Sequence, residues 1–496
     1  MRRPRKLVLA VVDGCKPSML ERAVATGQAP VLERVMEEGA YTDSCAAAFP
    51  SVTPACAASI ATGLGPDRHL IPSMNWFHRT EGRYVEYGSS FSASRQFGLY
   101  RSLTDTVYNM NLAHLSSEVE TVFESLDDAG VRTAGTTYLM YRGRHRHEVS
   151  NESALARLAT STLFRHAVYG PKELFYADIF ASRRTGCRGQ LGLPGARDQH
   201  AGCVGAYLVE NDLFDFLLLS LPDNDTHSHK NGPHAQVQSI AYADRQIERL
   251  AHAAGGMDEF LADHAVVVMA DHSHAAVEAS VDLAAAFGGW DVLAPSSPKG
   301  TEAEIALCPA QRSAMVYVLD PERSGELTIR AAAQALALEG VDLVMHRSGE
   351  EGVVRTTRGE LRFSPGGELS DVRGEPWHVE GDLDALRARV EDGRILTPDY
   401  PDGLARAWSA LSCPTAGDVL LSAAPGFEFV DWGGQHHVGG GSHGSLHRSD
   451  SLGALAWCGV GPGVDAREQW TLRDVVPMVR EHFGLGDVPR DVPNAG

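Results

Sequence analysis

The chain has 496 residues, of which 43% are hydrophobic and 22% are charged, as is typical of a globular protein with two or three domains. Its formal net charge of −20 argues against a nucleic-acid scaffold, because such proteins normally present a basic face. An acidic surface also suits a protein that carries cations, although most acidic proteins carry none.

The chain begins with basic residues and a short apolar run, Leu7 to Val12, that ends at Asp13. A signal peptide needs an apolar stretch of about 7–15 residues and a small-residue cleavage site, so this run predicts a buried strand instead. No other segment approaches the roughly 18 apolar residues of a membrane span. We therefore expect no membrane association and a cytoplasmic location.

Two further apolar runs, at 214–225 and 264–274, are also short and nearly continuous, and both end in polar residues. Such runs are typical of parallel strands that are covered by helices on both faces. The spacing of apolar residues predicts helices at 29–40, 117–130 and 235–256. The alternation of strand and helix predicts an α/β fold with a doubly wound, mostly parallel sheet flanked by helices.

Two stretches rich in Tyr, Arg, Gly and Ser, near 73–110 and 142–205, are predicted to be insertions over the sheet. Residues 312–404 contain a strand, a helix and a hairpin-like pattern, which predict a smaller α/β subdomain inserted into the core. The main sheet is expected to resume at 418–429 and 452–461. The predicted domains are the first part of the core at 1–311, the subdomain at 312–404 and the second part of the core at 405–496.

The eight cysteines show no CxxC spacing, and a chain of this size does not need disulfides for stability. We therefore expect reduced thiols throughout. The cysteines are Cys15, Cys45, Cys56, Cys187, Cys203, Cys308, Cys413 and Cys458.

Each of the three buried strands is followed by side chains that can bind a metal: Asp13, the segment Asp223–His229, and Asp271 with His272. A single Asp at a strand end is more often a turn former or a helix cap. Ligands of open α/β sheets, however, bind beyond the carboxyl ends of the strands. These three features are therefore predicted to converge on one site.

The segment after the second strand contains two interleaved pairs, Asp223 with His227 and Asp225 with His229. Both pairs are separated by four residues, so each would share one face of a helix. The spacing alone leaves open which pair binds a ligand.

Two more segments can contribute to the same site. Thr53 precedes Pro54 at a predicted helix start, where it is either a structural N-cap or a hydroxyl placed at an anion-binding helix terminus. The glycine-rich stretch 439–450 contains His443, which is either a ligand on a closely approaching backbone or an incidental loop residue. His436 and His437 have no evident partner and are left out of the predicted site.

Taken in order, these motifs resemble the alkaline phosphatase superfamily, and within it the nucleotide pyrophosphatase/phosphodiesterase branch. That branch shows a strand ending in Asp, then a Thr nucleophile upstream of an (A/V)TG motif and an Asn about twenty residues later. It continues with D-x-x-x-H before Gly-Pro, a strand ending in Asp-His-Gly and a late G-x-H-G. The matching residues here are Asp13, Thr53 with Gly63, Asn75, Asp225 and His229 before Gly232-Pro233, Asp271-His272, and His443-Gly444.

The resemblance implies a site with two zinc ions. One ion would be held by Asp13, Thr53, Asp271 and His272, and the other by Asp225, His229 and His443. This assignment leaves Asp223 and His227 as neighbours of the site. The chain departs from the family at Ser273-His274, where Gly usually follows Asp-His, and at Pro54–Ala57 after the nucleophile, which leaves Ser51 as a minor rival nucleophile.

The implied reaction is hydrolysis of a phosphodiester or pyrophosphate bond. Thr53 would attack phosphorus in line and form a phosphothreonine, which water then hydrolyses, while Asn75 would donate to a phosphate oxygen. Two Zn²⁺ ions, three aspartates and one alkoxide give a nearly neutral site. Because no Lys or Arg lies between Tyr41 and Asp67, a monoanionic diester is favoured over a dianionic monoester.

Three alternatives remain open at this point: a phosphonoacetate-type C–P hydrolase, a phosphomonoesterase, and a metal- or nucleotide-binding module without activity. A sulfatase is disfavoured because Thr53–Cys56 does not fit the C/S-x-P-x-R context of those enzymes. The expected partner is a small phosphate-ester substrate such as a nucleotide. The sequence gives no information on the oligomeric state.

Overall fold

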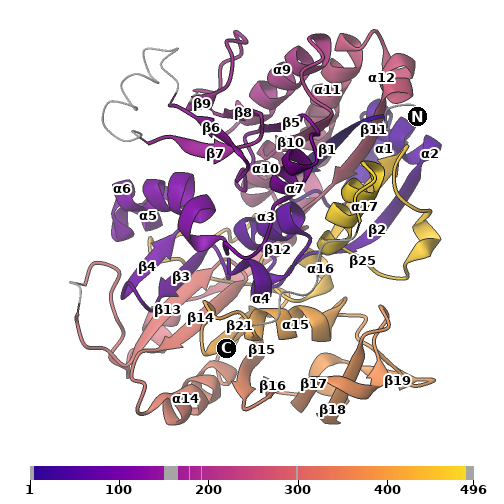
Figure 1. Ribbon diagram of the computed structural model, residues 1–496. Helices are drawn as coiled ribbons and strands as arrows, with labels where there is room; N and C mark the ends of the chain where they lie inside the picture. Colours follow the sequence, from indigo (N-terminus) through magenta and orange to yellow (C-terminus); the bar gives the residue numbers. More distant parts are fainter. Residues whose placement is uncertain (1–4, 150–165, 178, 191–192, 298–299, 487–496) are drawn as a thin grey trace.

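The computed structural model describes residues 5–149, 166–177, 179–190, 193–297 and 300–486 (Figure 1). Within these ranges the main sheet is mostly parallel: β1 pairs in parallel with both β10 and β11, whereas β24 is antiparallel to both of its neighbours. In spatial order its strands are β25 (Trp470–Thr471), β2 (Ala40–Ala46), β24 (Leu452–Cys458), β11 (His264–Met269), β1 (Lys6–Val12), β10 (Phe216–Leu221), β5 (Thr133–Thr136), β8 (Glu173–Tyr176) and β9 (Phe180–Ala181).

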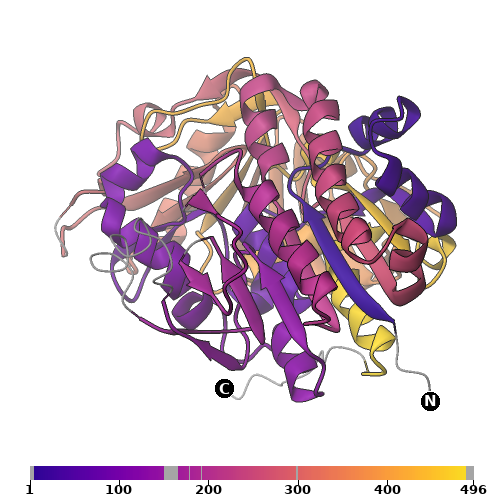
Figure 2. The same cartoon turned by 90° about the horizontal axis from the view of Figure 1, so that it is seen from above.

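Helices cover both faces of this sheet, and the alternation of side chains along β1 shows how. Leu7 and Leu9 belong to one hydrophobic cluster, and Val8 and Ala10 belong to another on the opposite face. The first face is covered by α3 (Thr53–Thr62), α7 (Val122–Asp128) and α17 (Val475–His482). The second face is covered by five helices: α1 (Pro17–Ala25), α2 (Pro30–Glu38), α9 (Arg197–Glu210), α11 (Val237–Ala253) and α12 (Met257–Asp263). In Figure 2 the long magenta and pink helices lie in front of the sheet and run in nearly the same direction as the indigo strand β1. The predicted doubly wound α/β fold is confirmed.

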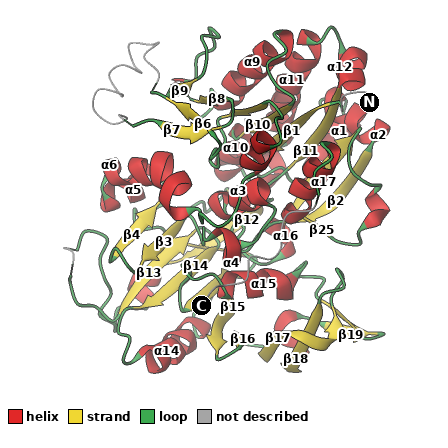
Figure 3. Ribbon diagram, viewed as in Figure 1, coloured by secondary structure: helices red, strands yellow, loops and turns green. Residues whose placement is uncertain are grey.

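A second sheet forms the lower part of the molecule in Figure 3. Its strands are β13 (Ile305–Ala310), β14 (Ser313–Val318), β21 (Val419–Ala423), β15 (Val341–Ser348), β16 (Glu351–Thr356), β17 (Gly359–Ser370), β20 (Arg394–Leu396) and β19 (Arg389–Glu391), with β18 (Pro376–Gly381) beside β17. Helices α14 (Ser324–Leu336) and α15 (Gly403–Leu411) pack on it. The predicted subdomain 312–404 lies within this unit.

The sheet nevertheless recruits strands from outside that range. Residues 418–429 do not resume the main sheet as expected: β21 pairs with β14 and β15 of the second sheet. An apolar run shows that a strand is buried but not which sheet buries it, so this boundary was not visible in the sequence. Residues 452–461, in contrast, do return to the main sheet as β24.

The two predicted insertions differ in the structure. Residues 73–110 form the hairpin β3 (Asn75–His78) and β4 (Arg83–Glu86), helices α5 (Phe91–Phe97) and α6 (Leu99–Thr104) and the start of η1 (Asp105–His114). Among the described residues of the 142–205 stretch, β6 (His145–His147) and β7 (Val168–Gly170) form a separate pair. Strands β8 and β9 of this stretch extend the main sheet, so its description as an insertion over the sheet was only partly right.

Shorter elements surround the strand ends. A three-stranded sheet contains β22 (Gly426–Phe429), β12 (Ala275–Val281) and β23 (Gly441–Ser442). The short helices are α4 (Pro66–His69), α10 (Asp223–Asn231), η3 (Pro233–Ala235), α13 (Leu283–Ala286), η4 (Leu383–Leu386), α16 (Arg448–Ser451), η5 (Val464–Ala466) and η6 (Leu472–Asp474).

The expectation of reduced thiols throughout was wrong. Cys187 and Cys203 form a disulfide with a Cα–Cα distance of 5.9 Å, and the other six cysteines are free and buried. This pair, separated by 16 positions, carries no spacing signal that marks it in the sequence. In the described part of the chain, no helix combines the length and apolar character needed to cross a bilayer.

Candidate metal centre

The three strands at the centre of the main sheet deliver polar side chains to one edge. Strands β11, β1 and β10 are adjacent and parallel, so their carboxyl ends lie side by side. Asp13 follows β1 directly, Asp271 follows β11, and Asp225 lies in the first turn of α10, which begins just after β10. The topology therefore brings together residues that are more than 200 positions apart in the sequence.

A first cluster consists of Asp13, Asp271 and His272, whose ligand atoms all lie within 4.8 Å of one another. His272 Nε2 is 3.4 Å from Asp13 Oδ1 and 3.5 Å from Asp271 Oδ2. The other oxygen of Asp271 accepts hydrogen bonds from the backbone N–H groups of Gly14 and His272, which fixes the carboxylate in place.

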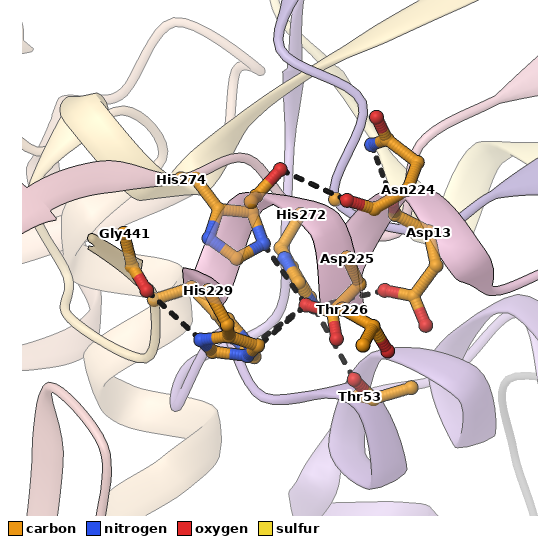
Figure 4. A network of polar contacts seen from close by, with 12 residues as sticks. Asp13, Thr53, Asn224, Asp225, Thr226, His229, His272, His274 and Gly441 are labelled. Carbon is orange, nitrogen blue, oxygen red and sulfur yellow. Dashed lines mark hydrogen bonds and ion pairs between the residues drawn. The ribbon is translucent and has the colours of Figure 1, made fainter. Parts of the chain in front are cut away.

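The Thr53 hydroxyl adjoins this first cluster. Its Oγ1 atom lies 3.3 Å from His272 Nε2 (Figure 4). Thr53 is the first residue of α3, and the N-cap position belongs to Val52. The structural interpretation of Thr53 as an N-cap is therefore wrong, and its hydroxyl faces the cluster.

A second cluster consists of Asp225, His229, His274 and His443. The Nε2 atoms of the three histidines lie 3.3 Å (His229), 2.9 Å (His274) and 3.4 Å (His443) from a single oxygen, Oδ1 of Asp225. The two clusters adjoin, because the rings of His272 and His443 stack with centroids 3.6 Å apart. All seven predicted metal ligands are thus brought to one place.

Backbone carbonyls set the orientation of the histidine rings. The Nδ1 atoms of His229, His272 and His443 lie 2.8–3.1 Å from the carbonyl oxygens of Gly441, Ser273 and Ser51, respectively. Because a carbonyl only accepts, each of these Nδ1 atoms carries a proton, which leaves Nε2 as the nitrogen that can bind a metal. All three Nε2 atoms point toward carboxylate oxygens.

This arrangement is unfavourable without a cation. Burial, together with the charges of Asp271 and Asp225, raises the pKa of Asp13 well above its usual value, and burial raises the pKa of Asp271 to about 6. Burial also lowers the pKa of His443 to about 4, so that this ring is neutral. Asp13 Oδ1 and His443 Nε2 are buried and have no hydrogen-bond partner within the described ranges.

The side chains of the two clusters are suitable metal ligands. Neutral imidazoles and carboxylates are the ligands that zinc prefers, and the imidazole Nδ1–H groups are held by backbone carbonyls as in many metal sites. The side chains of both clusters range from fully buried to 17% exposed. The residues therefore fit a pair of metal ions.

The three residues that competed with the predicted ligands and nucleophile, Asp223, His227 and Ser51, have other partners in the structure. Asp223 accepts hydrogen bonds from Arg197 and from the backbone N–H of Asp198, and His227 Nε2 contacts the carbonyl of Ala235. The hydroxyl of Ser51 is fully buried and donates to the carbonyl of Ser445. None of the three belongs to either cluster.

Asn75 is buried at the start of β3. Its amide nitrogen donates to the carbonyl of Val85 at 3.0 Å, which uses one of its two N–H groups, and its Oδ1 atom has no hydrogen-bond partner within the described ranges. The role of Asn75 toward a phosphate oxygen stays a prediction.

Sequence reasoning missed two histidines. His274 is a full member of the second cluster, and its only signal was its place two residues after His272 at a strand end. His437 stacks on His229 with centroids 4.1 Å apart, and its Nδ1 atom lies 3.0 Å from the buried carboxylate of Glu428. His437 is thus a neighbour of a predicted ligand and a member of neither cluster, in agreement with its omission from the predicted ligand set.

A sequence model of the family described as type I phosphodiesterase / nucleotide pyrophosphatase matches residues 7–446. The chain belongs to this family. The predicted resemblance is confirmed, and family membership identifies the chain as a metal-dependent phosphoric-ester hydrolase. A search of curated proteins found no match.

Solved structures share the fold at low sequence identity. The murine ectonucleotide pyrophosphatase / phosphodiesterase 5 has a TM-score of 0.58 and 11% identity, with 98% of this chain and 97% of that chain covered. The phosphonoacetate hydrolase from Sinorhizobium meliloti 1021, in complex with phosphonoformate, has a TM-score of 0.54 and 17% identity, with coverage of 95% and 94%. These two similarities support the assignment of the fold.

Proposed function

We propose that this protein hydrolyses phosphodiester or pyrophosphate bonds with two zinc ions and Thr53 as the nucleophile. The observation that carries the proposal is the position of the Thr53 hydroxyl, 3.3 Å from His272 Nε2 and beside two adjoining clusters of buried carboxylates and imidazoles. Asp13, Thr53, Asp271 and His272 would hold one ion, and Asp225, His229 and His443 the other.

The metal ions and the protein residues have separate roles in the proposed reaction. When bound, a zinc pair lowers the pKa of a coordinated hydroxyl and neutralises the charge of the phosphate. Thr53 lies at the N-terminus of α3, where the helix dipole favours the incoming anion. Its oxygen attacks phosphorus in line, which forms a phosphothreonine and releases the first alcohol or nucleotide, and water then regenerates the hydroxyl.

A diester is the favoured substrate class. The charge balance of the proposed site is near neutral, and α3 with its flanks, from Thr42 to Pro66, contains no Lys or Arg that would compensate a second phosphate charge. In addition, an inactive threonine-to-alanine variant of the murine phosphodiesterase 5 was solved with AMP, which supports a threonine nucleophile and a nucleotide-like ligand.

A phosphonoacetate-type hydrolase is the second candidate, because structures of such an enzyme with phosphonoacetate and phosphonoformate share this fold over 95% of the chain. The two functions predict different relative rates of hydrolysis for three substrates. We expect p-nitrophenyl-thymidine phosphate to be hydrolysed faster than p-nitrophenyl phosphate or phosphonoacetate. If the nucleotide diester is the slowest of the three, the diesterase proposal fails.

The nucleophile is tested with Thr53→Ala. The zinc-loaded variant should lose at least about 10³-fold in kcat, because the attacking oxygen is removed, and it should still bind zinc, because Asp13, Asp271 and His272 remain as ligands. Thr53→Ser should keep part of the activity, and Thr26→Ala, at an exposed threonine outside the site, should match the wild type. Full activity of Thr53→Ala would exclude this residue as the nucleophile.

The location of the protein stays open to experiment. A cytoplasmic location was predicted, but the Cys187–Cys203 disulfide weighs against it, since such bonds are rare in cytosolic proteins. Thiol labelling of the protein isolated from each cell fraction measures both properties: a reduced pair in the cytosolic fraction supports the cytoplasmic location, and an oxidised pair in a secreted fraction contradicts it.

A further inference from the structure

The second cluster contains one more histidine than its family pattern requires. His274 is fully buried, directly precedes β12, and places its ring beside those of His229 and His443, with centroids 4.9 and 5.0 Å away. The family pattern assigns three ligands to this position, and His274 follows the Asp-His motif at a point where the chain departs from that pattern. Its presence among the ligand atoms therefore needs its own explanation.

Three distances in the second cluster are close to the edge length of a zinc tetrahedron. Four ligand atoms bound to zinc at about 2.0–2.1 Å lie about 3.3 Å from one another. Asp225 Oδ1 lies 3.3 Å from Nε2 of His229, 2.9 Å from that of His274 and 3.4 Å from that of His443, and all four ligand atoms lie within 4.8 Å of one another. An ion held by Asp225, His229 and His443 would thus have the His274 ring at its remaining position, which would otherwise be available to water or substrate.

The surrounding backbone makes room for this ring and holds it there. A Cβ atom at Gly14 would lie 2.7 Å from His274 Nε2, and Gly14 has a φ of +66°, which glycine adopts without strain. The carbonyl of His274 accepts a hydrogen bond from Lys16 Nζ at 3.0 Å, and the next residue, Ala275, pairs with Ser442 of β23. The position of His274 is thus fixed by both sides of the loop.

The contacts of the neighbouring rings favour a cation at the centre of the cluster. The Nε2 atoms of His229 and His443 both face the Asp225 carboxylate, because their Nδ1 atoms donate to backbone carbonyls on the other side of each ring. His274 Nδ1 is buried without a hydrogen-bond partner among the described residues. A hydrogen bond from His274 to Asp225 would relieve only one of these three contacts, whereas a cation at the centre relieves all of them.

We propose that His274 is a fourth protein ligand of the second metal position, which gives that ion an Asp–His₃ set. The inference rests on the proposed two-metal function. Four protein ligands complete a tetrahedral sphere, so the ion at this position is held tightly, and a phosphate oxygen can bind it only by expansion to five ligands.

The experiment compares variants that separate ligation from hydrogen bonding. In His274→Gln the amide can still donate a hydrogen bond to Asp225 but is a poor zinc ligand, whereas in His274→Cys a thiolate can bind the ion. His274→Ala can neither bind the ion nor donate a hydrogen bond. The matched control is His227→Ala, which removes a histidine of α10 that lies outside the cluster. Each metal-free protein is titrated with Zn²⁺ against a chromophoric chelator and with Co²⁺ while the visible spectrum is recorded.

Wild type and His227→Ala should bind two ions. In His274→Ala and His274→Gln one of the two affinities should fall at least about 100-fold, since even the loss of a residue that only supports a ligand costs about 10–100-fold. The Co²⁺ spectrum at that position should lose its tetrahedral intensity. His274→Cys should recover the second ion and add a sulfur-to-cobalt charge-transfer band.

Wild-type affinity and an unchanged Co²⁺ spectrum in His274→Gln would overturn the inference and make His274 a positioning residue for Asp225. Failure of His274→Cys to recover the second ion, with a native circular dichroism spectrum, would also count against ligation. If the wild type binds no pair of ions, the proposed two-metal function itself fails, and this outcome is distinguishable because it appears before any substitution is made.

Discussion

A buried ion pair supports the loop that carries His443, and its loss is expected to weaken both the fold and the metal site. Arg312 Nη1 and Asp450 Oδ1 are 2.7 Å apart, and both side chains are completely buried. The backbone N–H of Arg312 donates to the carbonyl of His443 at 2.8 Å. Asp450 also accepts hydrogen bonds from the backbone N–H and the hydroxyl of Ser445. The ion pair therefore links Arg312, the residue before β14, to both ends of the loop 443–450.

The perturbation is Asp450→Asn, which keeps the shape of the side chain and removes its charge. One end of the amide carries N–H groups, so it must face either the guanidinium of Arg312 or the backbone N–H of Ser445, donor against donor. Charge-assisted hydrogen bonds are lost and a buried guanidinium is left uncompensated. Removal of one partner of a buried pair typically costs about 3–5 kcal/mol of the free energy of unfolding.

Urea unfolding at equilibrium, followed by tryptophan fluorescence on metal-free protein, measures this loss, and Zn²⁺ titration measures the second affinity. The double variant with Arg312→Met should show a coupling of at least about 2 kcal/mol with the single variants. Glu326→Gln, which breaks an exposed ion pair with Arg323, should leave the unfolding curve unchanged. A loss below about 1 kcal/mol in Asp450→Asn would refute the support role of the pair.

Two further changes test other parts of the site's surroundings. Gly14→Ala should lower the affinity for the second ion about tenfold or more, because a Cβ atom there would lie 2.7 Å from the ring of His274. It should also destabilise the fold by about 1–2 kcal/mol, because the backbone at this position has a φ of +66°. A Zn²⁺ titration equal to that of the wild type would contradict this expectation. Burial, together with the charge of Asp223, raises the pKa of Asp198 to about 8, so the folded protein retains a proton that the unfolded chain releases above a pH of about 4. The stability contributed by Asp198 therefore falls as the pH rises from about 4 to 8. Asp198→Asn should flatten this part of the pH profile of the free energy of unfolding, measured with urea. An unchanged profile would show that Asp198 ionises normally.

The central strands and the predicted ligands were accessible from the sequence for one physical reason. Parallel strands buried on both faces are nearly continuous apolar runs, and the first polar residue after each run lies at the carboxyl edge of the sheet. Asp13 and Asp271 could be placed at the same edge in this way without any long-range information. The choice between the pairs Asp223/His227 and Asp225/His229 could not, because both pairs lie on the helix α10 and only its packing orients one of them toward the edge.

The features that the sequence did not reveal depend on contacts between distant segments. His274 belongs to the cluster because Gly14 leaves space for its ring, and nothing in the local sequence of either residue states that they meet. His437, in the loop that precedes β23, contacts the buried carboxylate of Glu428, which lies nine positions earlier on β22. The membership of β21 in the second sheet is equally a matter of pairing, since its apolar composition would suit either sheet.

The metal centre and the fold are coupled through the same charges. Asp13 and Asp271 are buried side by side. Burial and the charges of Asp271 and Asp225 raise the pKa of Asp13, and burial raises the pKa of Asp271 to about 6. Ionisation of these carboxylates in the metal-free protein therefore places uncompensated negative charge at the centre of its main sheet, whereas divalent cations convert the same charges into attraction. Because the unfolded chain has no assembled site, the binding free energy adds to the stability of the folded state. The chain tolerates such a concentration of buried carboxylates at the ends of its central strands because ions are expected to occupy the space between them.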